Sequence, residues 1–250
     1  MHQGQPALGQ VQGDEVLICA GNLFDAPKAT GARVALAGLT WMAPCEPGKI
    51  IGLWNNFRAA AAKNGWAEPV DPLYFLKSPA SATGHDTLIP APPPEIGRVA
   101  YEGELAIVIG RTARRIARDD AAGCIFGCTV ANDVTAMELL QRDPSFPQWT
   151  RAKSFDGFGA LGPWIDTDFK PAGATLVTRV GGRERQNYAL DDMVFSPVDL
   201  VWRLSQDMTL LPGDVILCGT SLGVLPMKPG TTVEVEISGL GLLRNVYGVT

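Results

Sequence analysis

The sequence predicts an α+β fold in which β-strands predominate. Short apolar runs bounded by glycine and proline outnumber the segments with helical periodicity, which is typical of a strand-rich protein. The helical segments do not follow the strands in the regular βαβ alternation of a doubly wound sheet. The chain has 250 residues, 46% of them hydrophobic, which is enough to bury a sizeable core.

We expect a small N-terminal β segment, residues 1–44, and a larger unit, residues 45–250, that meet at a linker. The first segment alternates short apolar runs with turn residues, and the proline-bracketed stretch 41–47 is typical of a linker. In the larger unit a strand is expected at 49–53, a short alanine-rich helix at 55–63 and a strand at 73–77.

From residue 99 onward the pattern predicts alternating strands and helices, followed by a β-rich end. Strands are expected at 99–109, 127–130, 215–218 and 233–237, and helices at 119–125, 135–141 and 197–211. A hairpin turn is expected at Val180–Arg183, where two glycines follow an apolar run.

Composition excludes several classes of partner. The formal charge is −5 and no Lys/Arg stripe is present, so no nucleic-acid partner is expected. No apolar stretch approaches the roughly 20 residues of a membrane span, so no membrane partner is expected. The N-terminus has neither a basic start nor a continuous apolar run, and we expect no secretory signal.

Cysteine and histidine usage narrows the possible chemistry. The five cysteines are scattered, which predicts reduced, mostly buried thiols in a cytoplasmic protein. The chain has two histidines, so a Cys/His zinc site is disfavoured and His85 is the one plausible base of a histidine mechanism. Proton chemistry therefore falls to carboxylates, lysine or metal-bound water.

The most informative motif is a pair of glutamates, Glu102 and Glu104, at the start of an apolar run. Side chains alternate across a strand, so both project to one face, with Cα atoms roughly 6.5–7 Å apart. Such neighbours repel each other, and a hard divalent cation compensates well. Asp133 ends another apolar stretch and adds a third carboxylate. The alternative is that the glutamates are solvated and pair with nearby arginines (Arg111, Arg114 and Arg115).

Two further motifs follow the acidic ones in a fixed order. Lys153 lies in the segment 149–158, and Thr220 follows the apolar run 215–218 and a glycine. With these four motifs together, residues 45–250 resemble the fumarylacetoacetate hydrolase superfamily. The resemblance implies a mixed β-roll of the fumarylacetoacetate hydrolase C-terminal domain type, with a metal pocket at its open end, and a homodimer.

The resemblance also implies roles for individual residues. Glu102, Glu104 and Asp133 match the family's ligands for Mg²⁺ or Mn²⁺, a metal that would polarise a 2-oxo acid substrate. Lys153 matches the active-site lysine, with a surface ion pair to Asp156 as the structural alternative. Thr220 matches a residue that contacts the substrate carboxylate; its alternative is a turn position.

Other positions are candidate substrate contacts or departures from the family pattern. Arg58 and Lys77 could neutralise a distal carboxylate, and both could equally be structural. After Asp133 the family carries an arginine and a glutamine; here Met137 and Leu140 stand there, with Gln141 adjacent as the candidate contact.

The departure with the largest consequence concerns the short helix after the first strand of the larger unit. The family's hydrolases carry a water-activating histidine and glutamate there, whereas this chain has Ala60 and then Ala62 or Lys63. We therefore expect an isomerase or decarboxylase of a small 2-oxo or 2-hydroxy-enol dicarboxylic acid from aromatic-compound catabolism. One alternative is a C–C hydrolase of an acylpyruvate or fumarylacetoacetate-type substrate, with His85 or metal-bound hydroxide as base. Another is a catalytically silent paralogue that binds metal and an oxo acid.

Overall fold

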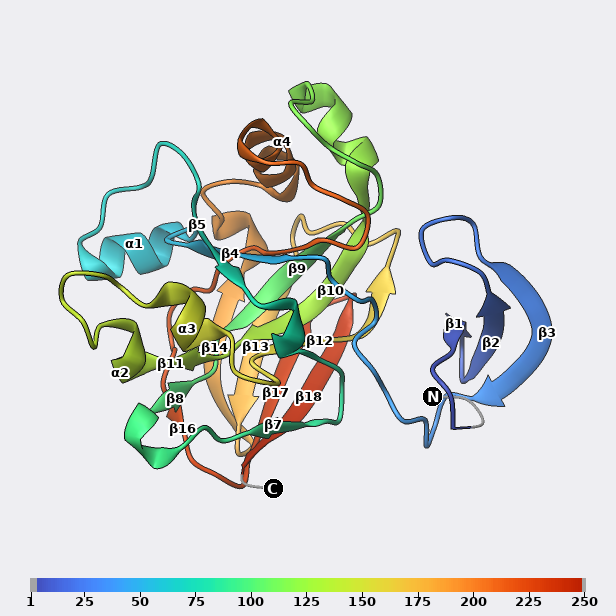
Figure 1. The fold of residues 1–250 in the computed structure, drawn as a ribbon, viewed down its shortest axis with the longest axis horizontal. Helices are drawn as coiled ribbons and strands as arrows, with labels where there is room; N and C mark the ends of the chain where they lie inside the picture. Colours follow the sequence, from blue (N-terminus) through green and yellow to red (C-terminus); the bar gives the residue numbers. More distant parts are fainter. Residues whose placement is uncertain (1–3, 249–250) are drawn as a thin grey trace.

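The computed structural model describes residues 4–248 as a curled, strand-rich roll with a small sheet at its side (Figure 1). Residues 1–3 lie outside the described residues. They are part of the N-terminal stretch in which we expect no secretory signal. Among the described helices, none has the length and apolar character needed to cross a membrane.

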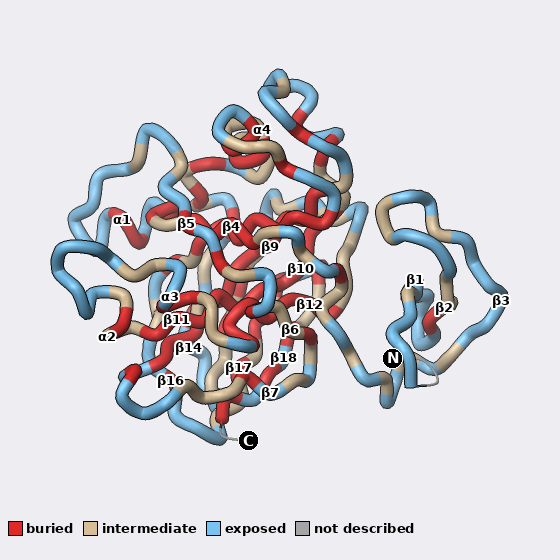
Figure 2. Tube along the Cα trace, in the orientation of Figure 1, coloured by how far each residue is buried: buried red, intermediate tan, exposed pale blue. Residues whose placement is uncertain are grey.

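The small sheet contains three antiparallel strands in the order β1-β2-β3. They are β1 (Leu8–Gln12), β2 (Glu15–Ala20) and β3 (Lys28–Ala35). Most of its residues are exposed, as the pale tube in Figure 2 shows. It is tied to the roll by the loop after β2, where the ring of Phe24 packs edge-on against Phe126 with centroids 5.0 Å apart. Residues 41–47 then lead into the roll without a helix or strand.

The largest sheet has seven strands in the order β5-β4-β15-β9-β10-β12-β6. Most neighbours are antiparallel, and β15 with β4 and β12 with β6 are parallel. The strands are β4 (Ile50–Trp54), β5 (Leu73–Lys77), β6 (Ala82–Thr83), β9 (Gly103–Ile109), β10 (Ile125–Asp133), β12 (Gly159–Asp166) and β15 (Val215–Leu217). Every residue of β9 is buried, which agrees with the continuous apolar run that follows Glu104 in this strand.

A second sheet of five strands, in the order β14-β13-β17-β18-β7, packs against β9, β10 and β12. Its strands are β7 (Leu88–Pro90), β13 (Thr175–Val180), β14 (Arg183–Ala189), β17 (Thr231–Ile237) and β18 (Gly241–Gly248). Three short strands form a third sheet, namely β8 (Val99–Ala100), β11 (Thr135–Ala136) and β16 (Pro226–Met227). The buried residues concentrate between the two large sheets (Figure 2). This architecture confirms the predicted α+β, strand-dominated fold.

The helices are short and lie around the roll. They are α1 (Arg58–Asn64), α2 (Met137–Leu140), α3 (Trp149–Lys153) and α4 (Pro197–Asp207), with 3₁₀ turns η1 (Pro79–Ser81), η2 (Pro94–Ile96), η3 (Arg118–Cys124) and η4 (Leu190–Asp192). The Ser196 hydroxyl caps α4 by accepting the Asp199 N–H at 3.2 Å. This helix ends before the predicted residue 211, because the backbone of Leu210 pairs with Ala113 instead.

Three further predicted elements differ from the structure in type or continuity. The predicted helix 119–125 is the 3₁₀ turn η3, and the predicted helix 135–141 begins as strand β11 before the single turn of α2. The predicted strand 99–109 is interrupted at Tyr101 and Glu102. There the backbone of Glu102 bonds to the Asn132 side chain and the Asp133 N–H, at 3.0 and 2.8 Å.

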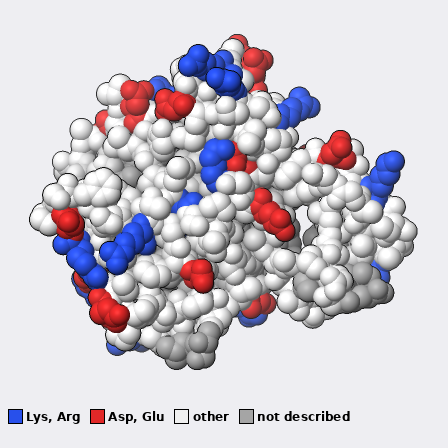
Figure 3. All heavy atoms as spheres, viewed as in Figure 1, with Lys and Arg blue, Asp and Glu red and all other residues white. Residues whose placement is uncertain are grey.

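The cysteines are mostly buried, and the surface charges are mixed in sign. All five cysteines are free and four are buried, which confirms the expectation of mostly buried thiols. Acidic and basic side chains are interspersed on the face shown in Figure 3. The expected absence of nucleic-acid and membrane partners stays a prediction.

Candidate metal centre

Three carboxylates meet where β9 begins and β10 ends. Glu104 lies on β9, Glu102 directly precedes that strand and Asp133 is the last residue of β10. The antiparallel register pairs Gly103 with Asn132, so the two strand ends bring their side chains together. One oxygen from each carboxylate lies within 4.8 Å of the others. No recorded contact joins Arg111, Arg114 or Arg115 to either glutamate in the described part of the chain.

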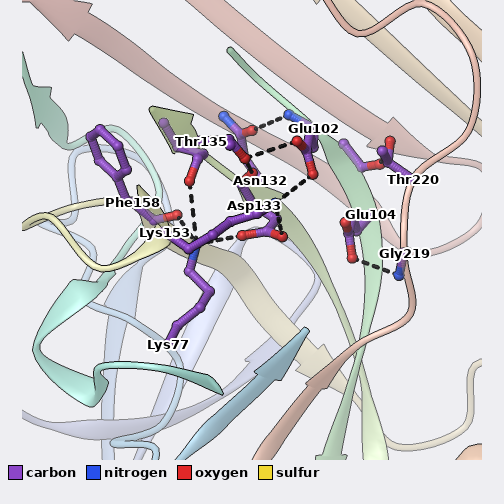
Figure 4. Close-up of polar contacts among 12 residues, drawn as sticks. Lys77, Glu102, Glu104, Asn132, Asp133, Thr135, Lys153, Phe158, Gly219 and Thr220 are labelled. Carbon is purple, nitrogen blue, oxygen red and sulfur yellow. Dashed lines mark hydrogen bonds and ion pairs between the residues drawn. The ribbon is translucent and has the colours of Figure 1, made fainter. Parts of the chain in front are cut away.

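Glu104 is the least compensated member of the trio. Its side chain is buried and its Oε2 accepts the Gly219 N–H at 2.7 Å (Figure 4). Its Oε1 has no hydrogen-bond partner among residues 4–248. Burial, followed by the charges of Asp133 and Glu102, raises the pKa of Glu104 well above its usual value. A buried carboxylate oxygen without a partner is costly unless a cation binds it.

Two buried lysines compensate the other two carboxylates. Lys153, the last residue of α3, donates to Glu102 Oε2 at 2.7 Å and to Asp133 Oδ2 at 2.6 Å. Lys77, the last residue of β5, contacts Asp133 Oδ1 and donates to the Phe158 carbonyl at 2.9 Å. Burial alone would raise the pKa of Asp133, but the charges of Lys153 and Lys77 together lower it.

The pKa shifts of the lysines have distinct causes. Burial lowers the pKa of Lys77 and outweighs the attraction of Asp133. The pKa of Lys153 is raised: burial opposes the shift, but Asp133, Glu102 and Glu104 together outweigh it. Lys153 is therefore held as an ammonium group between two of the carboxylates, rather than as a surface partner of Asp156.

The donor set fits a hard divalent cation. When all groups are ionised, the two ammonium groups offset two of the three carboxylates and leave negative charge at Glu104. Mg²⁺ and Mn²⁺ prefer carboxylate oxygens and keep open positions for water and substrate oxygens. The unpartnered Oε1 of Glu104 is the ligand atom that such an ion would satisfy.

Three contacts near Glu102 set its orientation, and none of them was predicted. The Thr135 hydroxyl donates to Glu102 Oε1 at 2.8 Å. The Glu102 N–H donates to the Asn132 side chain, and its carbonyl accepts the Asp133 N–H (Figure 4). The signal in the sequence was the polar run around Asp133, in which Asn132 precedes the aspartate and Thr135 follows it by two residues.

The predicted substrate contacts fall in different places. Thr220 follows Gly219 next to the acidic trio, and its hydroxyl donates to the Gly103 carbonyl at 2.9 Å. Arg58 begins α1, contacts the Met193 carbonyl and lies 3.6 Å from Glu68. Gln141 directly follows α2, is exposed and makes no hydrogen bond to the trio within residues 4–248. The substrate-binding roles of these residues and of Lys77 stay predictions.

The histidine and glutamate that activate water in the family's hydrolases are not present on α1. On α1, Ala60 and Ala61 are buried, whereas Ala62 and Lys63 are exposed. His85 is engaged elsewhere: its Nδ1 accepts the Arg244 N–H at 3.1 Å, and its ring packs against Trp41. No recorded contact joins His85 to the trio in the described chain.

Comparisons with known proteins give relatives over most of the chain. Oxaloacetate tautomerase YisK of Bacillus subtilis is 35% identical over 216 residues, covering 81% of this chain and 71% of that protein. The 4-hydroxyphenylacetate degradation bifunctional isomerase/decarboxylase of Salmonella dublin is 36% identical over 201 residues, covering 79% of this chain and 46% of that protein. The crystal structure of 5-carboxymethyl-2-hydroxymuconate delta-isomerase from Mycobacterium smegmatis superposes with a TM-score of 0.88 and 37% identity, covering 98% of this chain and 94% of that chain.

Family models cover both parts of the sequence. Residues 1–44 match the model described as Rv2993c-like, N-terminal. Residues 49–247 match the model described as fumarylacetoacetate (FAA) hydrolase C-terminal, and the curled mixed sheet agrees with that fold. The chain therefore belongs to the fumarylacetoacetate hydrolase family.

Proposed function

We propose that this protein is a divalent-metal-dependent isomerase or decarboxylase of a small 2-oxo or 2-hydroxy-enol dicarboxylic acid from aromatic-compound catabolism. The observation that carries the proposal is the convergence of Glu102, Glu104 and Asp133, with one buried oxygen of Glu104 unpartnered. The names of the related isomerases, decarboxylase and tautomerase support this kind of reaction.

In this proposal the three carboxylates hold Mg²⁺ or Mn²⁺. When bound, the metal supplies a Lewis acid for the keto oxygen and stabilises the negative charge of an enolate. The protein contributes the orientation of its ligands. Thr135 fixes one oxygen of Glu102, Gly219 fixes one oxygen of Glu104, and Lys77 fixes one oxygen of Asp133.

Lys153 is the proposed catalytic residue. Its ammonium group lies between Glu102 and Asp133, where it adds positive charge beside a substrate oxygen and is placed to exchange a proton with the substrate. In isomerisation the Lys153 ammonium group would add a proton to a carbon of the enolate, and the resulting amine would take up the proton that the substrate loses. In decarboxylation the electron pair of the broken C–C bond enters the enolate, CO₂ leaves, and a proton is then added at carbon.

Neither of these reactions needs an activated water, and this distinguishes them from hydrolysis. A histidine or glutamate would have to remove a proton from water, whereas Ala60 and Ala62 have methyl side chains. His85 makes its recorded contacts with Arg244, Asp86 and Trp41 instead. The residues present on α1 thus favour isomerisation or decarboxylation.

The proposal is tested by incubating the protein with Mg²⁺ or Mn²⁺ and three substrate types: oxaloacetate, 5-carboxymethyl-2-hydroxymuconate and an acylpyruvate. A shift of the enol or diene absorbance, or release of CO₂, that requires both metal and Glu104 would support it. Cleavage of the acylpyruvate to pyruvate would instead indicate a hydrolase. Bound metal without any turnover would indicate the silent paralogue.

We also propose, from the family resemblance, that the protein is a cytoplasmic homodimer. Light scattering on the purified chain tests the oligomeric state, and a monomer at all concentrations would contradict it.

A further inference from the structure

Gly103, the residue between the two glutamates, occupies a position that admits only glycine. A Cβ atom there would lie 2.3 Å from Thr178 Oγ1 and 2.9 Å from Val235 Cγ1, both on the five-stranded sheet. The backbone of Gly103 therefore touches the second sheet directly. Any movement of this peptide would move the flanking side chains of Glu102 and Glu104.

Both polar groups of the Gly103 backbone are held by side chains rather than by a strand. Its N–H donates to Gln186 Oε1 at 3.0 Å. Its carbonyl accepts the Tyr188 hydroxyl at 2.6 Å and the Thr220 hydroxyl at 2.9 Å. Strand β15 pairs with β9 from Ala106 onward, so at Gly103 these side chains replace the missing strand neighbour.

Gln186 is the centre of this arrangement. It is 1% exposed, and its Oε1 also accepts the Thr178 hydroxyl at 2.9 Å. Its Nε2 donates to Thr220 Oγ1 at 2.9 Å, with the Ser221 and Leu222 carbonyls at 3.4 and 3.3 Å. A single amide thus accepts and donates at once, which neither a carboxylate nor a thioether can do. It joins β14 to the loop whose Gly219 N–H holds Glu104.

We propose that Gln186 and Tyr188 are positioning residues of the metal centre. Together with Thr220 they fix the Gly103 peptide, and this keeps the carboxylates of Glu102 and Glu104 converging on Asp133. The inference rests on the proposed metal-binding function. It also gives the Thr220 hydroxyl a defined role, because this hydroxyl donates to the Gly103 carbonyl and accepts from Gln186.

The test compares Mn²⁺ binding by the wild-type chain with binding by Tyr188→Phe and Gln186→Met. Calorimetry gives the affinity, and the electron paramagnetic resonance spectrum of bound Mn²⁺ reports the ligand geometry. Tyr101→Phe is the matched control, because the Tyr101 hydroxyl donates to the Gly223 carbonyl at 2.7 Å and not to Gly103. We expect Tyr188→Phe and Gln186→Met each to lose about 10-fold or more in Mn²⁺ affinity. Tyr101→Phe should bind Mn²⁺ like wild type.

A second measurement tests, without metal, whether these side chains hold the Gly103 peptide. Hydrogen exchange at the Gly103 amide should be faster in Gln186→Met than in wild type and in Tyr101→Phe. If Gln186→Met does not fold, Tyr188→Phe still decides the question, since it removes one oxygen atom. Wild-type Mn²⁺ affinity and an unchanged Mn²⁺ spectrum in a folded Tyr188→Phe variant would overturn the inference. Failure of the wild-type chain itself to bind Mn²⁺ would instead overturn the proposed function.

Discussion

The Nζ atom of Lys153 lies 2.6 Å from Oδ2 of Asp133, and the opposite oxygen of that carboxylate contacts Lys77. The aspartate is therefore held at both oxygens by buried ammonium groups. Glu104 has no ammonium partner within the described residues, although it shares the same site. This uneven compensation makes Glu104 the position at which a bound cation changes the energy of the site most.

Glu104→Gln should abolish Mn²⁺ binding and turnover. The amide keeps an oxygen for the Gly219 N–H but removes the charge that faces Asp133 and Glu102. Because burial makes the charged form of Glu104 unfavourable without metal, and a glutamine is always neutral, the metal-free variant should unfold at the same or a higher temperature than wild type. Calorimetric titration and a thermal melt measure both effects. Undiminished Mn²⁺ affinity would remove Glu104 from the ligand set.

Lys153→Ala should retain the metal and lose activity. The substitution removes a cation and no carboxylate, so the ligand set stays intact while turnover falls by about 100-fold or more. Lys63→Ala is a suitable control, because Lys63 is an exposed lysine on α1. Steady-state rates at saturating Mg²⁺ or Mn²⁺ would decide the matter. A fully active Lys153→Ala enzyme would show that this residue is not catalytic.

Lys77→Met should destabilise the metal-free protein strongly. The change leaves Asp133 with one ammonium partner in a buried site and removes one of the two donors to the Phe158 carbonyl, which keeps the Val134 N–H at 3.0 Å. Breaking a buried ion pair from one side typically costs about 3–5 kcal/mol in free energy of unfolding. Urea denaturation measures this, with Lys63→Met expected within about 0.5 kcal/mol of wild type. Equal stability of the two variants would contradict the structural role of Lys77.

Asp199→Asn should destabilise the protein at neutral pH and have no effect in strong acid. Partial burial would raise the pKa of Asp199, but contacts with Ser196 and Arg118 lower this pKa below its usual value in the folded state. A lowered folded-state pKa stabilises the fold above the unfolded value, and this contribution is lost as the pH falls through the folded value. The difference at pH 7 should be below about 1 kcal/mol, because the Arg118 partner is exposed. Urea titrations of both proteins at several pH values check the trend; a difference that grows toward acid would contradict it.

Several features of the site follow from local sequence patterns. The apolar run after Glu104 predicts a buried strand, and β9 is buried at every residue. The apolar residues before Asp133 predict a second strand, and β10 ends at that aspartate. Periodicity of two and of 3.6 residues is a local property, so these elements are visible in the chain alone.

Other features depend on partners that are distant in the sequence. Glu102 leaves the predicted strand because its backbone bonds with Asn132 and Asp133. For Lys77 the sequence left open a contact with the substrate or a structural role, and nothing in its strand indicates that it meets Asp133, 56 residues later. Likewise, no pattern around Gln186 indicates that its amide holds the backbone of Gly103.

The amino-acid sequence by itself determined the strand-rich class of this protein, its family and the three carboxylates that would bind a metal. Only the tertiary structure decided which lysine compensates which carboxylate, which carboxylate oxygen lacks a partner and which side chains hold Gly103. The reason is physical: strand patterns arise between residues a few positions apart, whereas buried charges and backbone groups are satisfied by whatever the folded chain brings within about 3 Å.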